Sequence, residues 1–263
     1  MSLASVHPLR PATASAPREA LLKLERVSLE LGGQQILQNI DLEIGKGEFV
    51  CVVGPSGCGK TTMLRLLAGL YQPTAGRVTY KGTPMTQPRQ DIAIVFQDYG
   101  KALLPWRTAK GNVALALEAI GARIEALLAK VGLPKSADKF PNQMSGGMQQ
   151  RLQIARCLAQ DPTVLLMDEP FGALDAMTRQ GLQDEILQIV AQTGATAFFV
   201  THDLEEALYL GDRVVGLLPH PGRVGLAFDV KLPRPRDQLT TREDPEFLRL
   251  RRELFDFIKA AES

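Results

Sequence analysis

A glycine-rich segment is the part of this sequence best suited to chemistry. Residues 54–61 read Gly-Pro-Ser-Gly-Cys-Gly-Lys-Thr and fit the pattern GxxxxGK followed by Ser or Thr, between an apolar run and a helix-like run. In such a loop the backbone N–H groups converge on phosphate oxygens, a lysine reaches the β- and γ-phosphates, and a threonine ligates Mg²⁺. We therefore expect a nucleoside triphosphate site. Its predicted residues are Gly54, Pro55, Ser56, Gly57, Cys58, Gly59, Lys60, Thr61 and Thr62.

Two carboxylates follow a second apolar run. Residues 163–169 read Thr-Val-Leu-Leu-Met-Asp-Glu, and ligands of parallel sheets bind at the carboxyl ends of the strands. We expect Asp168 to hold the Mg²⁺ shell and Glu169 to orient and polarise the attacking water, since phosphoryl transfer depends on positioning and charge stabilisation. These two segments also fit a kinase of a small metabolite, in which a substrate hydroxyl takes the place of water.

A third segment narrows the family. Residues 144–151 read Met-Ser-Gly-Gly-Met-Gln-Gln-Arg and open a predicted helix that ends near Ala159. Ser145 is expected to cap this helix, while the N–H groups of the two glycines face an anion. This segment resembles the signature motif of ATP-binding cassette proteins. Its position between the first two segments supports the resemblance. In that family the segment faces the γ-phosphate bound by a partner cassette, so that two copies close head to tail. The residues assigned to this contact are Ser145, Gly146, Gly147 and Gln149.

Further landmarks of the cassette family follow in order, and the resemblance covers residues 21–220. Gln97 matches the glutamine that contacts Mg²⁺ and water and couples the site to the transporter. Asp175 matches the aspartate of the D-loop at the dimer interface, and His202 matches the histidine that contacts the γ-phosphate. The resemblance thus implies ATP and Mg²⁺ as cofactors. It assigns catalysis to Glu169, His202 and Gln97, and the metal to Thr61, Gln97 and Asp168.

One position departs from the family pattern. The aromatic residue that usually stacks on adenine, before the glycine turn of the first hairpin, corresponds to Leu31. Leucine can contact the base but offers no π-stacking, which is worth about 1–3 kcal/mol per base in nucleic-acid sites. We therefore expect a weaker or less selective adenine site.

Two stretches point to a branch of the family. Residues 98–108 and residues 232–237, which read Leu-Pro-Arg-Pro-Arg-Asp, resemble the nitrate, sulfonate and taurine importers. This implies the ATP-hydrolysing subunit of an importer, held peripherally at the cytoplasmic face of the inner membrane by a permease that receives solute from an extracytoplasmic binding protein. Trp106 fits two interpretations: it fills a crevice under the helical subdomain, or it contacts the permease.

The alternative function is a non-transport cassette in DNA maintenance or translation. Such relatives usually carry coiled-coil insertions, a second cassette or basic extensions, and none is visible in the sequence. The 263 residues include 30 Lys and Arg against 29 Asp and Glu, so the net charge is +1. Without a basic field, nucleic acid is not an expected partner.

Length and composition, with 45% hydrophobic and 22% charged residues, indicate one large α/β domain or one domain with an inserted subdomain. No apolar run approaches the roughly 20 residues of a membrane helix, so we do not expect the chain to cross a bilayer. Cys51, Cys58 and Cys157 are odd in number and lack CxxC spacing, which argues against a disulfide framework or a metal site. His7 and His220 are interpreted as surface residues.

Hydrophobic patterning predicts an α/β fold with a mainly parallel core sheet, an N-terminal antiparallel β subdomain and an inserted α-helical subdomain. Together with the phosphate-binding loop and the family resemblance, this implies a P-loop NTPase. Predicted strands are 21–31, 36–44, 48–53, 71–80, 91–96, 163–167, 196–200, 213–218 and 223–229. Predicted helices are 61–70, several within 109–160, 176–192 and one from Asp244.

These elements give a domain plan with three parts. Residues 1–20 are predicted to be a disordered tail, residues 21–230 the ATP-binding domain with its helical subdomain at about 109–160, and residues 231–263 a C-terminal extension. The apolar stripe of the last helix is expected to pack on the domain. Its members are Phe247, Leu250, Leu254, Phe257 and Ile258.

Overall fold

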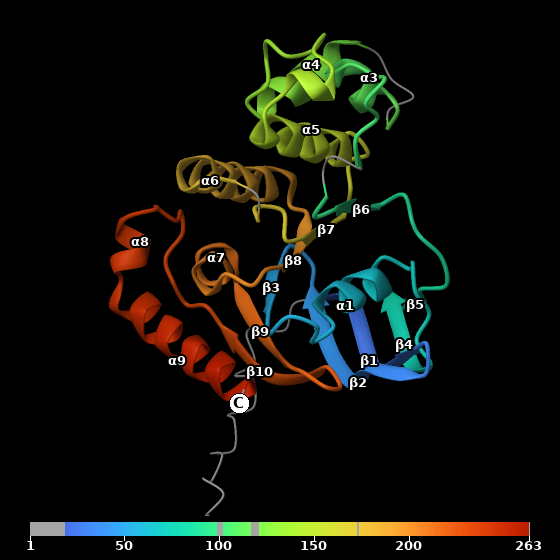
Figure 1. The fold of residues 1–263 in the computed structure, drawn as a ribbon, viewed down its shortest axis with the longest axis vertical. Coiled ribbons are helices and arrows are strands. Elements are labelled where there is room, and N and C mark those ends of the chain that lie inside the picture. The colour runs from blue at the N-terminus through green and yellow to red at the C-terminus, as the bar shows by residue number, and fades with distance from the viewer. Residues whose placement is uncertain (1–18, 99–101, 117–120, 173, 263) are drawn as a thin grey trace, which may run out of the picture.

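The computed structural model describes residues 19–98, 102–116, 121–172 and 174–262 (Figure 1). Residues 1–18, which carry His7 and most of the predicted tail, lie outside the described residues. The strands are β1 Ala20–Leu31, β2 Gln34–Gly45, β3 Phe49–Val53, β4 Ala75–Tyr80, β5 Thr83–Pro84, β6 Ile92–Val95, β7 Val164–Asp168, β8 Thr196–Val200, β9 Arg213–Leu218 and β10 Arg223–Asp229. The helices are α1 Lys60–Leu67, α3 Ala109–Ala114, α4 Gly121–Lys130, η1 Pro141–Gln143, α5 Gly146–Leu158, α6 Ala176–Thr193, α7 Leu204–Leu210, α8 Thr240–Glu243 and α9 Pro245–Ala261.

The larger sheet has the strand order β10-β9-β3-β8-β7-β6. Its strands are parallel except for β10, which runs antiparallel to β9. Every residue of β3 is buried, and successive residues face different cores: Cys51 lies in one hydrophobic cluster, while Val50 and Val52 lie in the other. A strand covered on both faces needs apolar residues at every position, which explains the unbroken apolar run in the sequence.

The smaller sheet, with order β2-β1-β4-β5, is antiparallel throughout, as predicted for the N-terminal β subdomain. The strand expected at residues 71–80 begins only at Ala75. Pro73 has no N–H to donate to a neighbouring strand, so the prediction was wrong for residues 71–74. The helix expected at 61–70 is likewise shorter, because Gly69 adopts a φ of +72° two residues beyond the end of α1.

Helices α3, α4 and α5 pack against one another at one end of the molecule, where α5 contacts β6 of the larger sheet and α6 lies nearby (Figure 1). They occupy the region where the helical subdomain was predicted. Trp106, which directly precedes this group, is 71% exposed. The interpretation in which Trp106 fills a crevice was therefore wrong.

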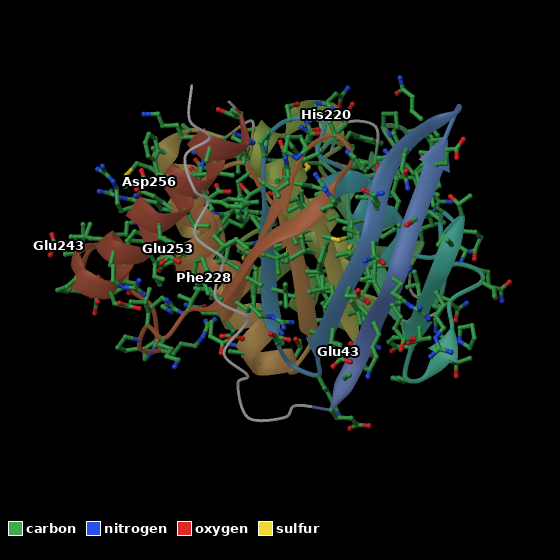
Figure 2. The ribbon with its side chains drawn as sticks, turned by 90° about the horizontal axis from the view of Figure 1, so that it is seen from below. Glu43, His220, Phe228, Glu243, Glu253 and Asp256 are labelled. Carbon is green, nitrogen blue, oxygen red and sulfur yellow. The ribbon has the colours of Figure 1, made fainter. Side chains whose placement is uncertain are left out.

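The C-terminal extension packs on α7. Phe247, Leu250 and Leu254 of α9 are buried, so the predicted apolar stripe does face the domain. Glu253 and Asp256, labelled in Figure 2, lie on the exposed face of α9. His220 is exposed in the turn between β9 and β10, as predicted (Figure 2). Among the described residues, no helix is both long and apolar enough to cross a membrane.

Two arginines of the Leu-Pro-Arg-Pro-Arg segment bind the carboxyl end of α7. Arg234 donates from Nη2 to the carbonyl oxygen of Leu210 at 2.9 Å and forms an ion pair with Asp212. Arg236 donates to the carbonyl oxygens of Leu208 at 3.3 Å and Gly211 at 3.2 Å. These bonds satisfy carbonyl groups that a helix end leaves unpaired.

We predict that Arg236→Ala lowers the free energy of unfolding by about 1–3 kcal/mol, because it leaves buried carbonyl groups without donors. Arg252→Ala is the matched control, since Arg252 forms an exposed pair with Asp256 on the outer face of α9. Such pairs contribute about 0–1 kcal/mol. Urea unfolding of the two variants measures the difference. Equal stability would contradict a role for Arg236 in capping α7.

Candidate functional site

The glycine-rich loop joins β3 to α1. A Cβ atom at Gly54 would lie 2.8 Å from the carbonyl oxygen of Leu217, so only glycine fits there. Gly59 caps α1 in the left-handed conformation, with a φ of +95°. Glycine has no side chain that could accept a hydrogen bond from the first turn of α1. The backbone N–H groups of that turn are therefore available to bind an anion.

Lys60 is held inside this loop. Its side chain is buried, and Nζ donates to the carbonyl oxygens of Gly54 at 2.7 Å and Pro55 at 3.0 Å. A buried ammonium group requires such partners. The loop therefore presents a fixed positive charge beside the N-terminus of α1.

Thr61 and Asp168 meet across the sheet edge. Thr61, in the first turn of α1, donates from Oγ1 to Oδ1 of Asp168 at 3.0 Å. Asp168 is the last residue of β7, and burial raises the pKa of its carboxyl above the ordinary value. A hydroxyl and a carboxylate are hard oxygen donors of the kind that Mg²⁺ prefers, so the pair fits the predicted metal site.

The carboxylate of Glu169 faces two other predicted residues. Its Oε2 atom accepts from Nε2 of Gln97 and lies 3.2 Å both from that nitrogen and from Nδ1 of His202. Glu169 adopts a φ of +43°, a left-handed conformation that is costly for a residue other than glycine. Its N–H donates to the carbonyl oxygen of Val200 at 2.9 Å, which ties the strained residue to β8. The structure thus brings together all three predicted catalytic residues.

His202 occupies the turn between β8 and α7. Its side chain is 67% exposed, so the turn and the contact with Glu169 fix its position. Asp203 caps α7 by accepting from the N–H groups of Glu205 at 2.9 Å and Glu206 at 3.1 Å. The imidazole is therefore accessible on one side and meets Glu169 on the other.

Within the described residues, no hydrogen bond joins the predicted signature residues, Asp175 or Leu31 to the cluster of Gln97, Glu169 and His202. Ser145 caps α5 by accepting from the N–H of Met148 at 3.4 Å, and Asp175 caps α6 by accepting from Thr178 at 3.1 Å. Helix α5 belongs to the helical group, whereas α1 lies beside the sheets (Figure 1). Leu31 is 39% exposed at the end of β1. Also outside the cluster are Gly146, Gly147 and Gln149, at the start of α5.

The two helix starts nevertheless lie close together. A Cβ atom on Gly147 would approach within 2.8 Å of Cγ2 of Thr178 in the first turn of α6. Gln149 donates from Nε2 to the carbonyl oxygens of Pro141 at 2.9 Å and Met144 at 3.1 Å, which fixes the segment before α5. The predicted signature and D-loop residues therefore form one surface.

Several residues near the cluster were not predicted. A cavity of about 30 Å³ is lined by Glu169, Gly172, Arg179, Thr201, His202, Asp203 and Glu206. Glu206 is buried, and burial raises the pKa of its carboxyl to about 6. Glu205 and Glu206 both lie in the first turn of α7. Acidic residues there ordinarily interact with the helix dipole at the surface, so the sequence carried no signal that Glu206 is buried.

Comparison with known proteins decides the family. A family model described as "ABC transporter" matches residues 37–172. The bicarbonate transport ATP-binding protein CmpD of Synechocystis is 44% identical over 253 residues, which cover 91% of this chain and 89% of CmpD. The chain belongs to the ABC transporter family. It is an ATPase domain of that family. It is also 46% identical over 239 residues to the nitrate import ATP-binding protein NrtC of Synechococcus elongatus.

That match covers 87% of this chain but 36% of NrtC, so the chain spans about a third of the length of that relative. Among solved structures, the bacterial ABC transporter cassette MJ0796, in dimeric form, superposes with a TM-score of 0.71 at 33% identity, covering 80% of this chain and 99% of that one. The same cassette has been solved in a post-hydrolysis dimeric state with ADP and Pi. These ABC cassettes confirm the predicted P-loop NTPase fold.

The departure at Leu31 yields a prediction. Leu31→Tyr is expected to tighten ATP binding at least about five-fold, because an aromatic ring would add base stacking to an apolar contact. Binding of inorganic triphosphate, which has no base, should not change. Isothermal titration of both ligands measures this, with Leu239→Tyr at another exposed surface position as control. A gain for both ligands would mean that residue 31 does not contact the base.

Proposed function

We propose that this chain hydrolyses MgATP in a head-to-tail dimer of two copies and that hydrolysis drives import of a small inorganic anion of the nitrate or bicarbonate type through a membrane permease. The observation that carries the proposal is the placement of the Glu169 carboxylate between Gln97 and His202, beside the Thr61–Asp168 pair. The names of NrtC and CmpD support the solute class. The relatives described above give no support to sulfonate or taurine.

In this proposal the chain's own residues hold both the nucleotide and the water. Lys60 and the N–H groups at the start of α1 bind the β- and γ-phosphates, and Thr61, Asp168 and Gln97 hold the cation. When bound, Mg²⁺ neutralises charge that develops on the phosphate oxygens.

Glu169 orients a water molecule and accepts its proton as the water oxygen attacks the γ-phosphorus. The bond between that phosphorus and the oxygen bridging to the β-phosphate then breaks, which yields ADP and phosphate. Because Nδ1 of His202 faces Glu169, Nε2 is the nitrogen that remains to contact the γ-phosphate.

A second copy would complete the site. Ser145 is exposed at the N-terminus of the 13-residue helix α5, so its hydroxyl and the neighbouring N–H groups are accessible to a nucleotide held by a partner. Met177, beside the predicted D-loop, is 78% exposed and apolar, which suits a surface that becomes covered. The dimeric MJ0796 structures support this arrangement.

Trp106 suits contact with a permease. The side chain of Asn112, fully buried, accepts from the N–H of Leu104 at 2.8 Å and donates to the carbonyl oxygens of Leu104, Arg107 and Thr108. These bonds hold the loop around an exposed aromatic ring, and rigid exposed tryptophans are frequent energetic centres of interfaces. Through such a permease the chain would lie at the cytoplasmic face of the membrane, and the extracytoplasmic solute-binding protein would contact the permease alone.

The hydrolytic role is tested by Glu169→Gln. Loss of the proton acceptor is expected to lower kcat for ATP by about 10²–10⁴-fold, while ATP binding is retained. Phosphate release and nucleotide binding are measured on the same preparation, with Glu243→Gln, an exposed carboxylate of α8, as control. Wild-type turnover by the Glu169 variant would refute its role as the base.

The transport role is tested by affinity purification from detergent-solubilised membranes with ATP present and partners identified by mass spectrometry. We expect a polytopic permease, and we expect Trp106→Ala to reduce its recovery at least tenfold without loss of ATPase activity. Phe255→Ala, which removes another exposed aromatic ring, on α9, should leave recovery unchanged. Recovery of only ribosomal or DNA-bound partners would favour the non-transport alternative instead.

A further inference from the structure

Four polar residues outside the predicted motifs connect α6 with the turn that carries His202. They are Arg179, Gln183, Thr201 and Glu206, called here the polar bridge. Oε2 of Glu206 accepts from Oγ1 of Thr201 at 2.7 Å, and its Oε1 accepts from Nε2 of Gln183 at 3.3 Å. Gln183, Thr201 and Glu206 are buried. A carboxylate in such a position requires hydrogen-bond partners of this kind.

The bridge fixes the backbone on both sides of His202. The Thr201 hydroxyl, besides donating to Glu206, accepts from the N–H of Asp203 at 3.0 Å. The N–H of Thr201 donates to the carbonyl oxygen of Val52 at the end of β3. The direction in which the His202 side chain leaves the turn is therefore set by the Thr201 hydroxyl and its carboxylate partner.

Arg179 extends the bridge to the segment before α6. Its Nη2 donates to the carbonyl oxygen of Leu174 at 3.0 Å, adjacent to Asp175. Its Nη1 lies 3.6 Å from Oδ2 of Asp203, and its Nε lies 3.8 Å from Oε1 of Glu206. Within the described residues, Nε of Arg179 is buried without a hydrogen-bond partner. A small movement of Leu174 would therefore change how closely Arg179 pairs with the two carboxylates.

Stability alone does not account for this arrangement. Buried ionic groups can often be replaced by apolar residues of similar size with no loss of stability. The raised pKa of Glu206, caused by burial, reflects the cost of holding a charge at this position. The bridge also shares the small cavity that contains Glu169 and His202, which places this costly group beside the proposed reaction.

We propose that the polar bridge is a positioning device that sets His202 against Glu169 according to the position of the Leu174 carbonyl group. This inference rests on the proposed function, in which the D-loop aspartate Asp175 lies at the contact with the second copy and His202 contacts the γ-phosphate. Docking of the partner displaces the Leu174 carbonyl, Arg179 follows it, and Glu206 and Thr201 pass the displacement to the turn. The histidine thus reaches its working position only in the closed dimer.

Thr201→Val tests the bridge, because valine keeps the shape of threonine and removes the hydroxyl. We expect kcat for ATP to fall about 10- to 100-fold, the cost of displacing a catalytic group by about 1 Å, with less than about a two-fold change in KM. Thr201→Ser, which restores the hydroxyl, should return kcat to near the wild-type value. If the valine variant fails to fold, Arg179→Lys serves in its place, since lysine keeps the charge but loses the three-way contact.

Glu205→Gln is the matched control. Glu205 is the neighbouring carboxylate in the same helical turn and pairs with Arg242 and Arg251 of the C-terminal extension. Arg242 also donates to Oε1 of Gln183 at 3.3 Å, and a glutamine at position 205 keeps an acceptor for Arg242. Its substitution should leave kcat unchanged. A loss of kcat equal to that of Thr201→Val would show that any disturbance of α7 slows hydrolysis, and it would overturn the proposal.

A double-mutant cycle with His202→Ala separates the bridge from the proposed function. If the bridge acts through His202, Thr201→Val lowers kcat in the wild-type background but by less than about two-fold in the His202→Ala background. An equal reduction of kcat in both backgrounds would overturn the positioning role of the polar bridge and leave the proposed ATP hydrolysis intact. A wild-type kcat in the Thr201→Val variant would have the same meaning. A wild-type protein that does not hydrolyse ATP would instead overturn the proposed function, and the bridge with it.

Discussion

Parallel pairing of β3, β8, β7 and β6 is the constraint on which the site depends. Paired strands that run in one direction end at one edge, so residues far apart in sequence must meet there. Val52 is paired with Val200, and Asp168 is paired with that same residue of β8. A shift of one residue in either register would point the flanking side chains to the opposite face of the sheet.

The same constraint explains where the buried charges lie. The interior of the sheet accepts only apolar side chains, because both of its faces are covered by hydrophobic clusters. Lys60, Asp168 and Glu206 are all buried, and all three belong to segments that follow or end a strand at this edge. A further buried carboxylate, Glu48, precedes β3 at the opposite edge and pairs with Arg213. Each of the first three is held by hydrogen bonds from neighbouring segments, so the polar groups are oriented before any ligand arrives. Such preorganisation is the main way in which a protein stabilises developing charge.

Much of this could be predicted from sequence, because the decisive signals are local. A buried parallel strand reads as an apolar run, and a chemical group that follows it must lie at the sheet edge. Lys60 and Glu169 were found in this way, whereas His202 was assigned through the resemblance to the cassette family. Signals that depend on distant partners were missed. The exposure of Trp106 depends on hydrogen bonds from buried Asn112, and the burial of Glu206 depends on Gln183 and Thr201. Neither environment can be inferred from residue type or spacing.

The contacts between the C-terminal extension and α7 bear on the order in which the protein is made. Every segment of the catalytic cluster precedes the extension in the chain, and α9 follows α7 by more than thirty residues. While the ribosome still encloses the extension, the sheet and its loops can already form, but the carbonyl groups at the end of α7 lack Arg234 and Arg236. The helix that follows His202 is therefore fully anchored only late in synthesis, after the nucleotide loop has emerged.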